Sequence, residues 1–374
     1  MSNKLLIPTY SGDIHAVAVE QAIRQKGHDC YRWHATDFPT KQYINYVNVG
    51  THSDATYILL DELQGEFNIA DFDTVWHRRP SEPVLPKDLH EGDRIQARRE
   101  SIALAKSIWH FVNPNAFWVN HFNTVSYSGL KPLQLKIAKQ VGLKIPDTLI
   151  SNQPEQIREF IKLHQGNLIY KPLNQLGWTG EDRFYSVITS KISEEDLPSD
   201  EYLRLSPGIF QPYQEKAYEL RVTFMGKMPI AAKLHSQDNA STVIDWRTCS
   251  YSKTEMTVSP YQLPDKIVEQ CWKLMQQLGI VFGCFDFIVT PDREYIFLEV
   301  NPMGQFLWVE ELNPDIMMLD AFSEFLLAKT VDFQWAPSKS SIRYEGTLKQ
   351  TANNLNADDR NSHLEPERTL FPTD

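Results

Sequence analysis

Residues 282–305 read FGCFDFIVTPDREYIFLEVNPMGQ, and this stretch decides the fold. It holds two short apolar runs, 285–290 and 295–300, which are separated by the polar residues 291–294. Runs of this length joined by a proline-containing turn are typical of a β-hairpin. The strands of a hairpin are antiparallel, so the start of the first strand lies beside the end of the second.

This pairing predicts that three oxygen-bearing side chains meet. Asp286 lies near the start of the first strand, and Glu299 and Asn301 lie at the end of the second. Acidic residues at strand ends are more often solvated turn residues. Here, however, they interrupt apolar runs, and a buried acid needs a partner or a metal ion. Two carboxylates and an amide oxygen suit Mg²⁺, so we expect a magnesium site at these residues.

Composition and charge limit the possible partners. The chain has 374 residues, enough for two or three domains, and its 9 Trp, 15 Tyr and 19 Phe argue against general disorder. The net charge of −11 offers no basic field for nucleic acid, so an anion such as ATP would need a local cluster of cations. We expect no nucleic-acid partner.

The cysteines and the apolar runs predict the compartment. The four cysteines lack metal-ligand spacing, which indicates reduced thiols in a cytoplasm. The first apolar run is too short for a signal peptide, and no run is long enough to span a membrane. We therefore expect a cytoplasmic protein without a membrane partner.

The first third of the chain has the pattern of a parallel α/β unit. Residues 4–9 predict a buried strand, 14–26 a helix that Asp13 caps, and 30–33 a second strand. A long helix is expected over 88–110. We therefore predict an N-terminal α/β domain over residues 1–125.

Two adjacent arginines follow the apolar segment that ends at Trp76. Arg78 and Arg79 could bind an acidic group of a substrate through paired hydrogen bonds. Surface ion pairs explain the same residues equally well, and the sequence leaves both interpretations open.

Further cations accumulate in the middle of the chain. Lys171 ends a predicted strand and precedes a loop with two glycines that could hold a phosphate, although the GK[ST] of a P-loop is absent. Arg221 and Lys233 lie on the two strands of a second predicted hairpin, where two cations repel unless an anion lies between them. Arg247 is a third cationic candidate.

The remaining segments complete the predicted organisation. The extended link at Gln211, Pro212 and Tyr213 could present backbone groups to an adenine edge. We expect a central unit over 126–210 and a C-terminal unit over 211–335. Beyond Trp335 the chain becomes polar and loses its periodicity, which predicts a flexible tail over 336–374.

Taken together, these segments resemble the ATP-grasp ligases, and more narrowly the enzymes that cyclise ribosomally made peptides of the microviridin or graspetide type. The resemblance covers roughly residues 4–330. It is carried by VWHRRP at 75–80, KPLQLKIA at 131–138, GLKIPDT at 142–148, YKP at 170–172, FQPY at 210–213, KAYELRV at 216–222, and Asp286 with FLEVNPMGQ at 297–305. The last segment is shared with ATP-grasp enzymes generally, whereas WxRRP and ELRV point to the narrower family.

The resemblance implies an α/β (α+β) ATP-grasp fold with an N-terminal α/β subdomain, a central lid and a C-terminal antiparallel sheet. ATP would lie between the last two. The implied nucleotide-binding residues are Lys131, Lys171, Gln211, Pro212, Tyr213, Glu219 and Asn301. The residues facing the triphosphate or the reacting phosphate would be Arg221, Lys233 and Arg247. Mg²⁺ would be bound by Asp286, Glu299 and Asn301, and the substrate by Arg78 and Arg79.

The implied reaction uses ATP to activate an Asp or Glu side chain of a precursor peptide as an acyl phosphate. A Ser or Thr hydroxyl or a Lys amine of the same peptide then forms an ester or an amide, with release of ADP and phosphate. The precursor would carry a leader and an acidic, hydroxyl-rich core, and the enzyme could be a homodimer. Positioning and cationic stabilisation suffice for such chemistry.

Two other functions fit the same residues. One is an ATP-grasp ligase that adds free amino acids to a protein or a small acid, which differs only in its acceptor. The other is an ATP-binding regulatory protein without ligase activity, which the loss of a metal ligand or phosphate-binding lysine would favour.

Overall fold

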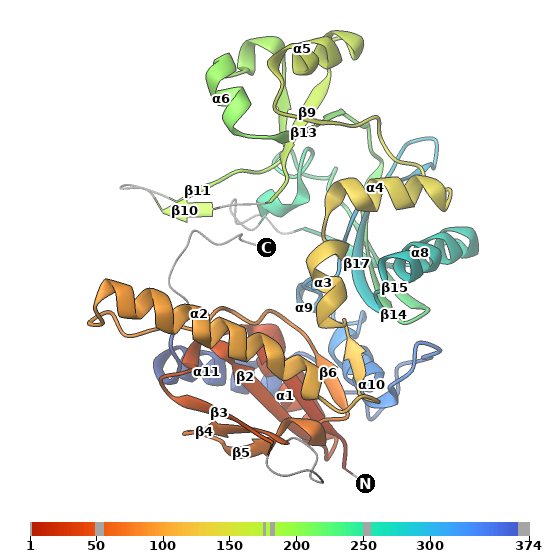
Figure 1. Cartoon of the computed structure of the whole chain (residues 1–374). Coiled ribbons are helices and arrows are strands. Elements are labelled where there is room, and N and C mark those ends of the chain that lie inside the picture. The colour runs from red at the N-terminus through yellow and green to blue at the C-terminus, as the bar shows by residue number, and fades with distance from the viewer. Residues whose placement is uncertain (1, 49–55, 175–176, 180–183, 250–255, 366–374) are drawn as a thin grey trace.

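The computed structural model describes residues 2–48, 56–174, 177–179, 184–249 and 256–365. Figure 1 shows the N-terminal part at one end of the molecule and the predicted lid at the other, with the C-terminal sheet beside the gap between them. Among the described residues, no helix is both long and apolar enough to cross a membrane.

The N-terminal part is built on a parallel sheet with the strand order β2-β1-β6-β7. Alternating burial of apolar side chains is absent here because the strands are covered on both faces, as parallel strands usually are. The strands and their neighbouring helices are β1 (Lys4–Thr9), α1 (Ile14–Gln25), β2 (Asp29–His34), β6 (Thr74–Trp76), α2 (Glu91–Ser107) and β7 (Phe117–Val119). Asp13 caps α1 as predicted, because its Oδ1 accepts the N–H of His15 at 3.2 Å.

A small antiparallel sheet packs beside the parallel one. Its strands are β3 (Gln42–Val47), β4 (Thr56–Asp61) and β5 (Gly65–Asn68). Aromatic side chains fill the space between the two sheets, and Tyr31 stacks on Phe67 with 4.0 Å between ring centroids. These aromatic contacts join the two sheets into one unit.

The predicted lid contains a four-stranded antiparallel sheet with the order β12-β9-β13-β8. Its elements are β8 (Leu149–Ser151), α5 (Pro154–Leu163), β9 (Leu168–Pro172), β12 (Ser190–Ile192), α6 (Asp200–Leu205) and β13 (Gly208–Pro212). A short hairpin of β10 (Gly177–Thr179) and β11 (Phe184–Ser186) stands apart from this sheet. The glycine-containing loop predicted after Lys171 lies partly outside the described residues.

The C-terminal sheet is five-stranded and antiparallel, with the order β16-β15-β14-β17-β18. Its strands are β14 (Tyr218–Met225), β15 (Met228–Leu234), β16 (Val258–Tyr261), β17 (Phe282–Val289) and β18 (Tyr295–Asn301). The helices α4 (Lys131–Gln140) and α8 (Asp265–Leu278) cover one face, where Leu220, Val222 and Phe285 are fully buried among their apolar side chains. The short helices α3 (Phe122–Ser128) and α9 (Leu307–Leu312) flank this sheet.

The prediction of a flexible tail over 336–374 is wrong for the part that the structure describes. Residues 346–362 form α11 (Gly346–Ser362), which packs against α1. The helix α10 (Met318–Ala328) also packs against α1. Leu348 and Ala352 of α11 are buried in the same apolar core as α1. The helix was missed because its exposed face is rich in Asn, Asp and Thr, which are weak helix formers.

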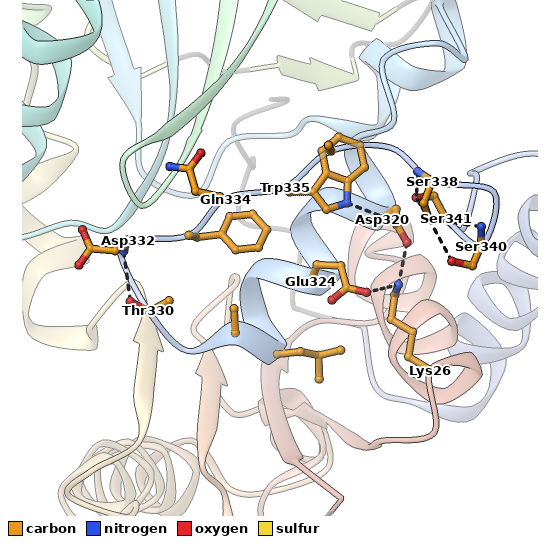
Figure 2. Close-up of a pocket in the computed structure, with 14 residues that line it drawn as sticks. Lys26, Asp320, Glu324, Thr330, Asp332, Gln334, Trp335, Ser338, Ser340 and Ser341 are labelled. Carbon is orange, nitrogen blue, oxygen red and sulfur yellow. Dashed lines mark hydrogen bonds and ion pairs between the residues drawn. The ribbon is translucent and has the colours of Figure 1, made fainter.

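The segment between α10 and α11 is held by a buried acid. Asp320 accepts a hydrogen bond from Trp335 Nε1 at 2.9 Å and from the N–H of Ile342 at 2.9 Å. The same carboxylate, with Glu324, pairs with Lys26 of α1 at 2.7 and 2.6 Å. Figure 2 shows the contacts of Asp320 with Trp335 and Lys26, and that of Glu324 with Lys26, at the wall of a cavity of about 590 Å³. These contacts fix the segment after α10 to the end of α1.

One buried cluster has the ligand types of a metal site. Among the described residues, His34, Asp359 and His363 could offer ligand atoms within 4.8 Å of one another. The guanidinium of Arg32 already binds both carboxylate oxygens of Asp359 and lies 3.4 Å from His34 Nε2. The two imidazoles stack with 3.6 Å between centroids, and His363 Nδ1 lies 2.6 Å from Asp37 Oδ2. The carboxylate of Asp359 thus already has a cationic partner, and this ion pair docks α11.

The buried ion pair between Arg32 and Asp359 predicts a strong effect of its removal. We expect Asp359→Ala to lower the free energy of unfolding by about 3 kcal/mol, because it leaves Arg32 buried with Glu20 as its remaining acidic partner. Denaturant unfolding followed by circular dichroism measures this change.

The neighbouring Asp358 is exposed on the same helix and gives a matched control. Asp358→Ala should change the free energy of unfolding by less than about 0.5 kcal/mol. Equal stability of the two variants would contradict the docking role assigned to Asp359.

Candidate functional site: a row of charged residues on the C-terminal sheet

The pairing of β14, β17 and β18 places three charged residues in one row. Arg221 lies opposite Asp286, and Asp286 lies opposite Glu299. Residues directly opposite each other in a sheet share a face. Arg221 donates hydrogen bonds from Nη1 to both oxygens of Asp286 at 3.0 Å and from Nη2 to the carbonyl of Gln305 at 2.8 Å.

Asn301 lies in the next row of the same face. It is two residues beyond Glu299 and opposite Cys284. Its Oδ1 accepts the N–H of Met303 at 3.0 Å, which orients the amide in the turn after β18. The predicted meeting of Asp286, Glu299 and Asn301 is confirmed as geometry, and their binding of a metal ion stays a prediction.

The helix α4 brings Lys131 to this row. Gln134 donates to the carbonyl of Val300 at 2.7 Å and accepts its N–H at 3.0 Å, so α4 is fixed along the edge strand β18. Lys131, at the first turn of α4, pairs with Glu299. Burial alone would raise the pKa of Glu299, but the nearby Lys131 and Arg247 outweigh burial and lower it. Glu299 is therefore a carboxylate at neutral pH.

Two further cations face the same carboxylates from other elements. Lys171 comes from the end of β9, and Arg247 is held by Asp245 through hydrogen bonds of 2.9 and 2.7 Å. Burial lowers the pKa of Lys171 to about 8; Glu299 opposes this effect, whereas Lys131 and Arg247 reinforce it. Burial raises the pKa of Asp286, and Arg221 counteracts that effect.

The site therefore gathers more positive than negative charge. Four cations surround the two carboxylates of the row: Lys131, Lys171, Arg221 and Arg247. Since the chain as a whole has a net charge of −11, this local excess is a specific feature of the site. An excess of cations beside two carboxylates suits a polyanion that arrives with a divalent cation.

The predicted adenine link lies at the end of β13. Gln211 is buried and donates from Nε2 to Thr148 Oγ1 at 2.9 Å. The N–H of Tyr213 bonds the carbonyl of Asn167 at 2.9 Å, and Lys191 lies 3.7 Å from the centre of the Tyr213 ring. Pro212 ends the strand between them. The contact of these residues with adenine stays a prediction.

Glu219 belongs to the same face of β14 as Arg221. It pairs with Lys216 at 2.8 Å, and both side chains are buried. Burial raises the pKa of Glu219, while Lys216 opposes the effect. Its predicted nucleotide contact remains untested.

The prediction that Lys233 lies beside Arg221 is wrong. Lys233 is opposite Leu220, whereas Arg221 is opposite Ala232, so the two cations project from opposite faces of the sheet. The ammonium of Lys233 lies 4.4 Å from the centre of the Tyr218 ring. This cation–π contact on the other face removes Lys233 from the charged row.

Arg78 also differs from its predicted role. Its side chain is 1% exposed, its Nε lies 3.1 Å from Asp13, and its Nη1 donates to the carbonyl of Met303. A side chain so enclosed cannot reach an acidic substrate in this structure, so the predicted substrate contact is wrong for Arg78. Arg79 is half-buried and donates to the same carbonyl at 3.3 Å, and its substrate contact stays a prediction.

Two residues of the N-terminal domain that sequence reasoning missed contact the turn after β18. His15 Nε2 accepts the N–H groups of Phe306 and Leu307. Asn120 donates from Nδ2 to the carbonyls of Phe282 and Pro302, both at 2.8 Å. No local pattern reveals these contacts, because the partners are 162 or more residues apart in the chain.

Comparisons with known proteins agree with this architecture. The sequence model of the MvdD pre-ATP grasp domain matches residues 4–126. The macrocyclase MdnB from Microcystis aeruginosa MRC is 31% identical, with a TM-score of 0.70 over 87% of this chain and 99% of MdnB. The chain belongs to the ATP-grasp ligases that include the microviridin macrocyclases. It is an ATP-dependent ligase.

Two other ATP-grasp ligases of this kind have been solved with peptides. The macrocyclase MdnC of the same organism, bound with its precursor peptide MdnA, is 30% identical with a TM-score of 0.72; the match covers 87% of this chain and 99% of MdnC. A RiPP-associated ATP-grasp ligase from Chryseobacterium gregarium, in complex with ADP and a leader and core peptide, is 26% identical. Its TM-score is 0.77, over 88% of this chain and 97% of that one. No curated protein matches the chain significantly.

The pKa of Lys171 predicts a pH dependence of ATP binding. A lysine whose pKa is about 8 is charged below that pH and neutral above it. A triphosphate favours the charged form, so the affinity for a non-hydrolysable ATP analogue should be highest, and nearly independent of this lysine's titration, below pH 8. It should fall by up to about tenfold per pH unit as the pH rises above 8. Calorimetric titrations at pH 7.5 and pH 9.5 measure this change.

Lys171→Arg provides the control, because a guanidinium stays charged throughout this range. The variant should lose most of the pH dependence between pH 7.5 and pH 9.5. The same steep fall in both proteins would exclude Lys171 as its cause.

The opposite faces of Arg221 and Lys233 predict unequal effects of substitution. Arg221→Lys keeps the charge but cannot bridge Asp286 and the carbonyl of Gln305 together, so kcat for ADP release should fall about 100-fold. Lys233→Met should stay within about threefold of the unmodified enzyme. Similar losses in both variants would contradict the placement of Lys233 outside the site.

Proposed function

We propose that this ligase joins carboxylate side chains of a ribosomally made precursor peptide to hydroxyl or amine side chains of the same peptide. The observation that carries the proposal is the charged row on the C-terminal sheet, with four cations around Asp286 and Glu299. The identity of 30–31% with two macrocyclases over 99% of their lengths supports the peptide substrate.

The residues present fit Mg²⁺ with ATP. The donor set is two carboxylates and an amide oxygen, which are hard ligands of the kind Mg²⁺ prefers, at Asp286, Glu299 and Asn301. When bound, Mg²⁺ would neutralise charge on the phosphates of ATP. Arg221 pairs with Asp286 and Lys131 pairs with Glu299 in this structure, so both carboxylates have a cationic partner beside the proposed metal position.

The chain's own cations account for the reaction. Arg221, Lys171 and Arg247 would orient the triphosphate and stabilise charge as the γ-phosphoryl group moves to an Asp or Glu carboxylate of the peptide. The bond between the γ-phosphorus and the bridging oxygen breaks, and ADP leaves. A Ser, Thr or Lys side chain then attacks the acyl carbon and loses its proton, and phosphate leaves with the new ester or amide in place.

The proposed substrate carries a leader segment and a core with acidic and hydroxyl or amine side chains. The MdnC structure contains a precursor peptide, and that of the Chryseobacterium gregarium ligase contains a leader and a core peptide, which supports a substrate of this kind. We place the reaction in the cytoplasm, since Cys30, Cys271 and Cys284 are buried thiols that suit a reducing compartment.

Intact-mass analysis tests the proposal. We expect small peptides rich in Thr, Ser or Lys and in Asp or Glu, encoded beside this gene, to lose about 18 Da per bond after incubation with the ligase, ATP and Mg²⁺. Each condensation removes one water, and ADP release should match the number of bonds. A gain in mass equal to an added amino acid would instead assign the chain to ligases that use free amino acids.

Two glutamates of the same hairpin give a matched pair of variants. Glu299→Gln should abolish the mass loss and ADP release, whereas Glu294→Gln should keep both, because Glu294 pairs with Lys144 at the exposed turn. Full activity of Glu299→Gln would remove Glu299 from the site.

A further inference from the structure

The turn after β18 is held both by its own hydrogen bonds and by contacts with other segments. It connects Asn301, which lies in the row next to the charged row, to the first turn of α9, and it includes the Gln305 carbonyl that accepts a hydrogen bond from Arg221. Within the turn, Asn301 accepts the N–H of Met303 at 3.0 Å, and the N–H of Gly304 bonds the Asn301 carbonyl at 3.2 Å. A shift of this turn would therefore move both Asn301 and the anchor of Arg221.

His15 binds this turn from the N-terminal domain. Its Nε2 accepts the N–H of Phe306 at 3.1 Å and that of Leu307 at 3.2 Å, and the side chain belongs to α1, 291 residues earlier. The imidazole is 4% exposed, and its ring stands edge-on to that of Phe306 with 5.3 Å between centroids. The residue is thus an enclosed acceptor for two neighbouring amides.

The imidazole has the correct protonation state for this task. Burial lowers the pKa of His15 to about 3, and the positive charge of Arg78 adds to the effect. The ring is therefore neutral at physiological pH. Because Nε2 accepts both hydrogen bonds, the proton of the neutral ring lies on Nδ1.

Three further side chains of the same domain contact the turn. Arg78 and Arg79 donate to the carbonyl of Met303, and Asn120 donates to that of Pro302 at 2.8 Å. These three side chains bind carbonyl oxygens, whereas His15 binds N–H groups. No acceptor other than His15 is recorded for these two amides among the described residues, and buried N–H groups without an acceptor are costly.

We propose that His15 is a positioning residue of the ligase, which fixes the turn at 302–307 and thereby sets the place of Asn301 in the Mg²⁺–ATP site. The proposal rests on the proposed function only in the assignment of Asn301 to that site. His15 lies in the segment matched to the pre-ATP grasp domain, so the proposal gives this domain a part in shaping the Mg²⁺–ATP site.

Calorimetry with Mg²⁺ and a non-hydrolysable ATP analogue tests the proposal without any peptide. We expect His15→Phe, which keeps the ring packing and loses the acceptor, to raise the Mg²⁺ concentration needed for half-maximal analogue binding about tenfold or more. His15→Gln keeps an acceptor oxygen and should recover most of the loss. His77→Phe is the control, since His77 is a buried histidine of the same domain whose ring packs on that of Trp109.

A double-mutant cycle separates positioning from general destabilisation. If His15 acts through the turn, His15→Phe should raise the Mg²⁺ concentration for half-maximal analogue binding much less in the Asn301→Ala background than in the unmodified enzyme. Full additivity of the two substitutions would overturn the proposal, as would unchanged Mg²⁺ dependence in His15→Phe. If His15→Phe fails to fold, the same cycle with His15→Leu, which also lacks the acceptor, decides the outcome.

Failure of the proposed peptide chemistry would be recognised separately. A ligase that binds the analogue with Mg²⁺ but leaves precursor peptides unchanged in mass would refute peptide cyclisation. The measured Mg²⁺ dependence of the His15 variants would still support or overturn the positioning role.

Discussion

A single extra residue in β18 decides which side chains share the face of the charged row. Phe287 pairs with Phe297, but Asp286 pairs with Glu299, so the ladder contains a β-bulge at Leu298. In an uninterrupted ladder Asp286 would lie opposite Leu298, and Glu299 would point into the apolar face beside Phe285. Because side chains alternate along a strand, the bulge moves Glu299 to the side of Asp286 and Arg221. The charged row, its pairing with Lys131 and the position of Asn301 all depend on this shift.

The sequence predicted which residues of the site lie close together better than it predicted the face of the sheet from which each side chain projects. The hairpin at 282–301 was sufficient to predict that Asp286, Glu299 and Asn301 meet, because a short turn forces antiparallel pairing. The bulge could not be predicted, since no residue in IFLEV marks it. Lys233 was misplaced because closeness across a hairpin does not determine on which face of the sheet a side chain lies. A change of one residue in the strand register moves a side chain to the opposite face.

Contacts between distant segments account for the other differences. Arg78 was read as a ligand for substrate, yet its partners are Asp13 and the backbone of Met303, which no local pattern indicates. Helix α11 did carry a weak signal, because Leu348, Ala352 and Leu355 have helical spacing. The other residues of α11 are mostly polar, and its few apolar residues are buried only because α1 packs against them. Both cases show that burial of polar side chains depends on partners far away in the chain.

The ion pair between Arg32 and Asp359 also has a consequence for the order of folding. Its partners are separated by 327 residues, and the helix that contributes Asp359 closes the core begun by α1 and β2. Contacts of such sequence separation form late, because the loop between them must first be ordered. During synthesis on the ribosome, the apolar side of α1 therefore stays exposed until nearly the whole chain has emerged. A nascent chain of this ligase therefore exposes that surface longer than a domain that is closed by local contacts does.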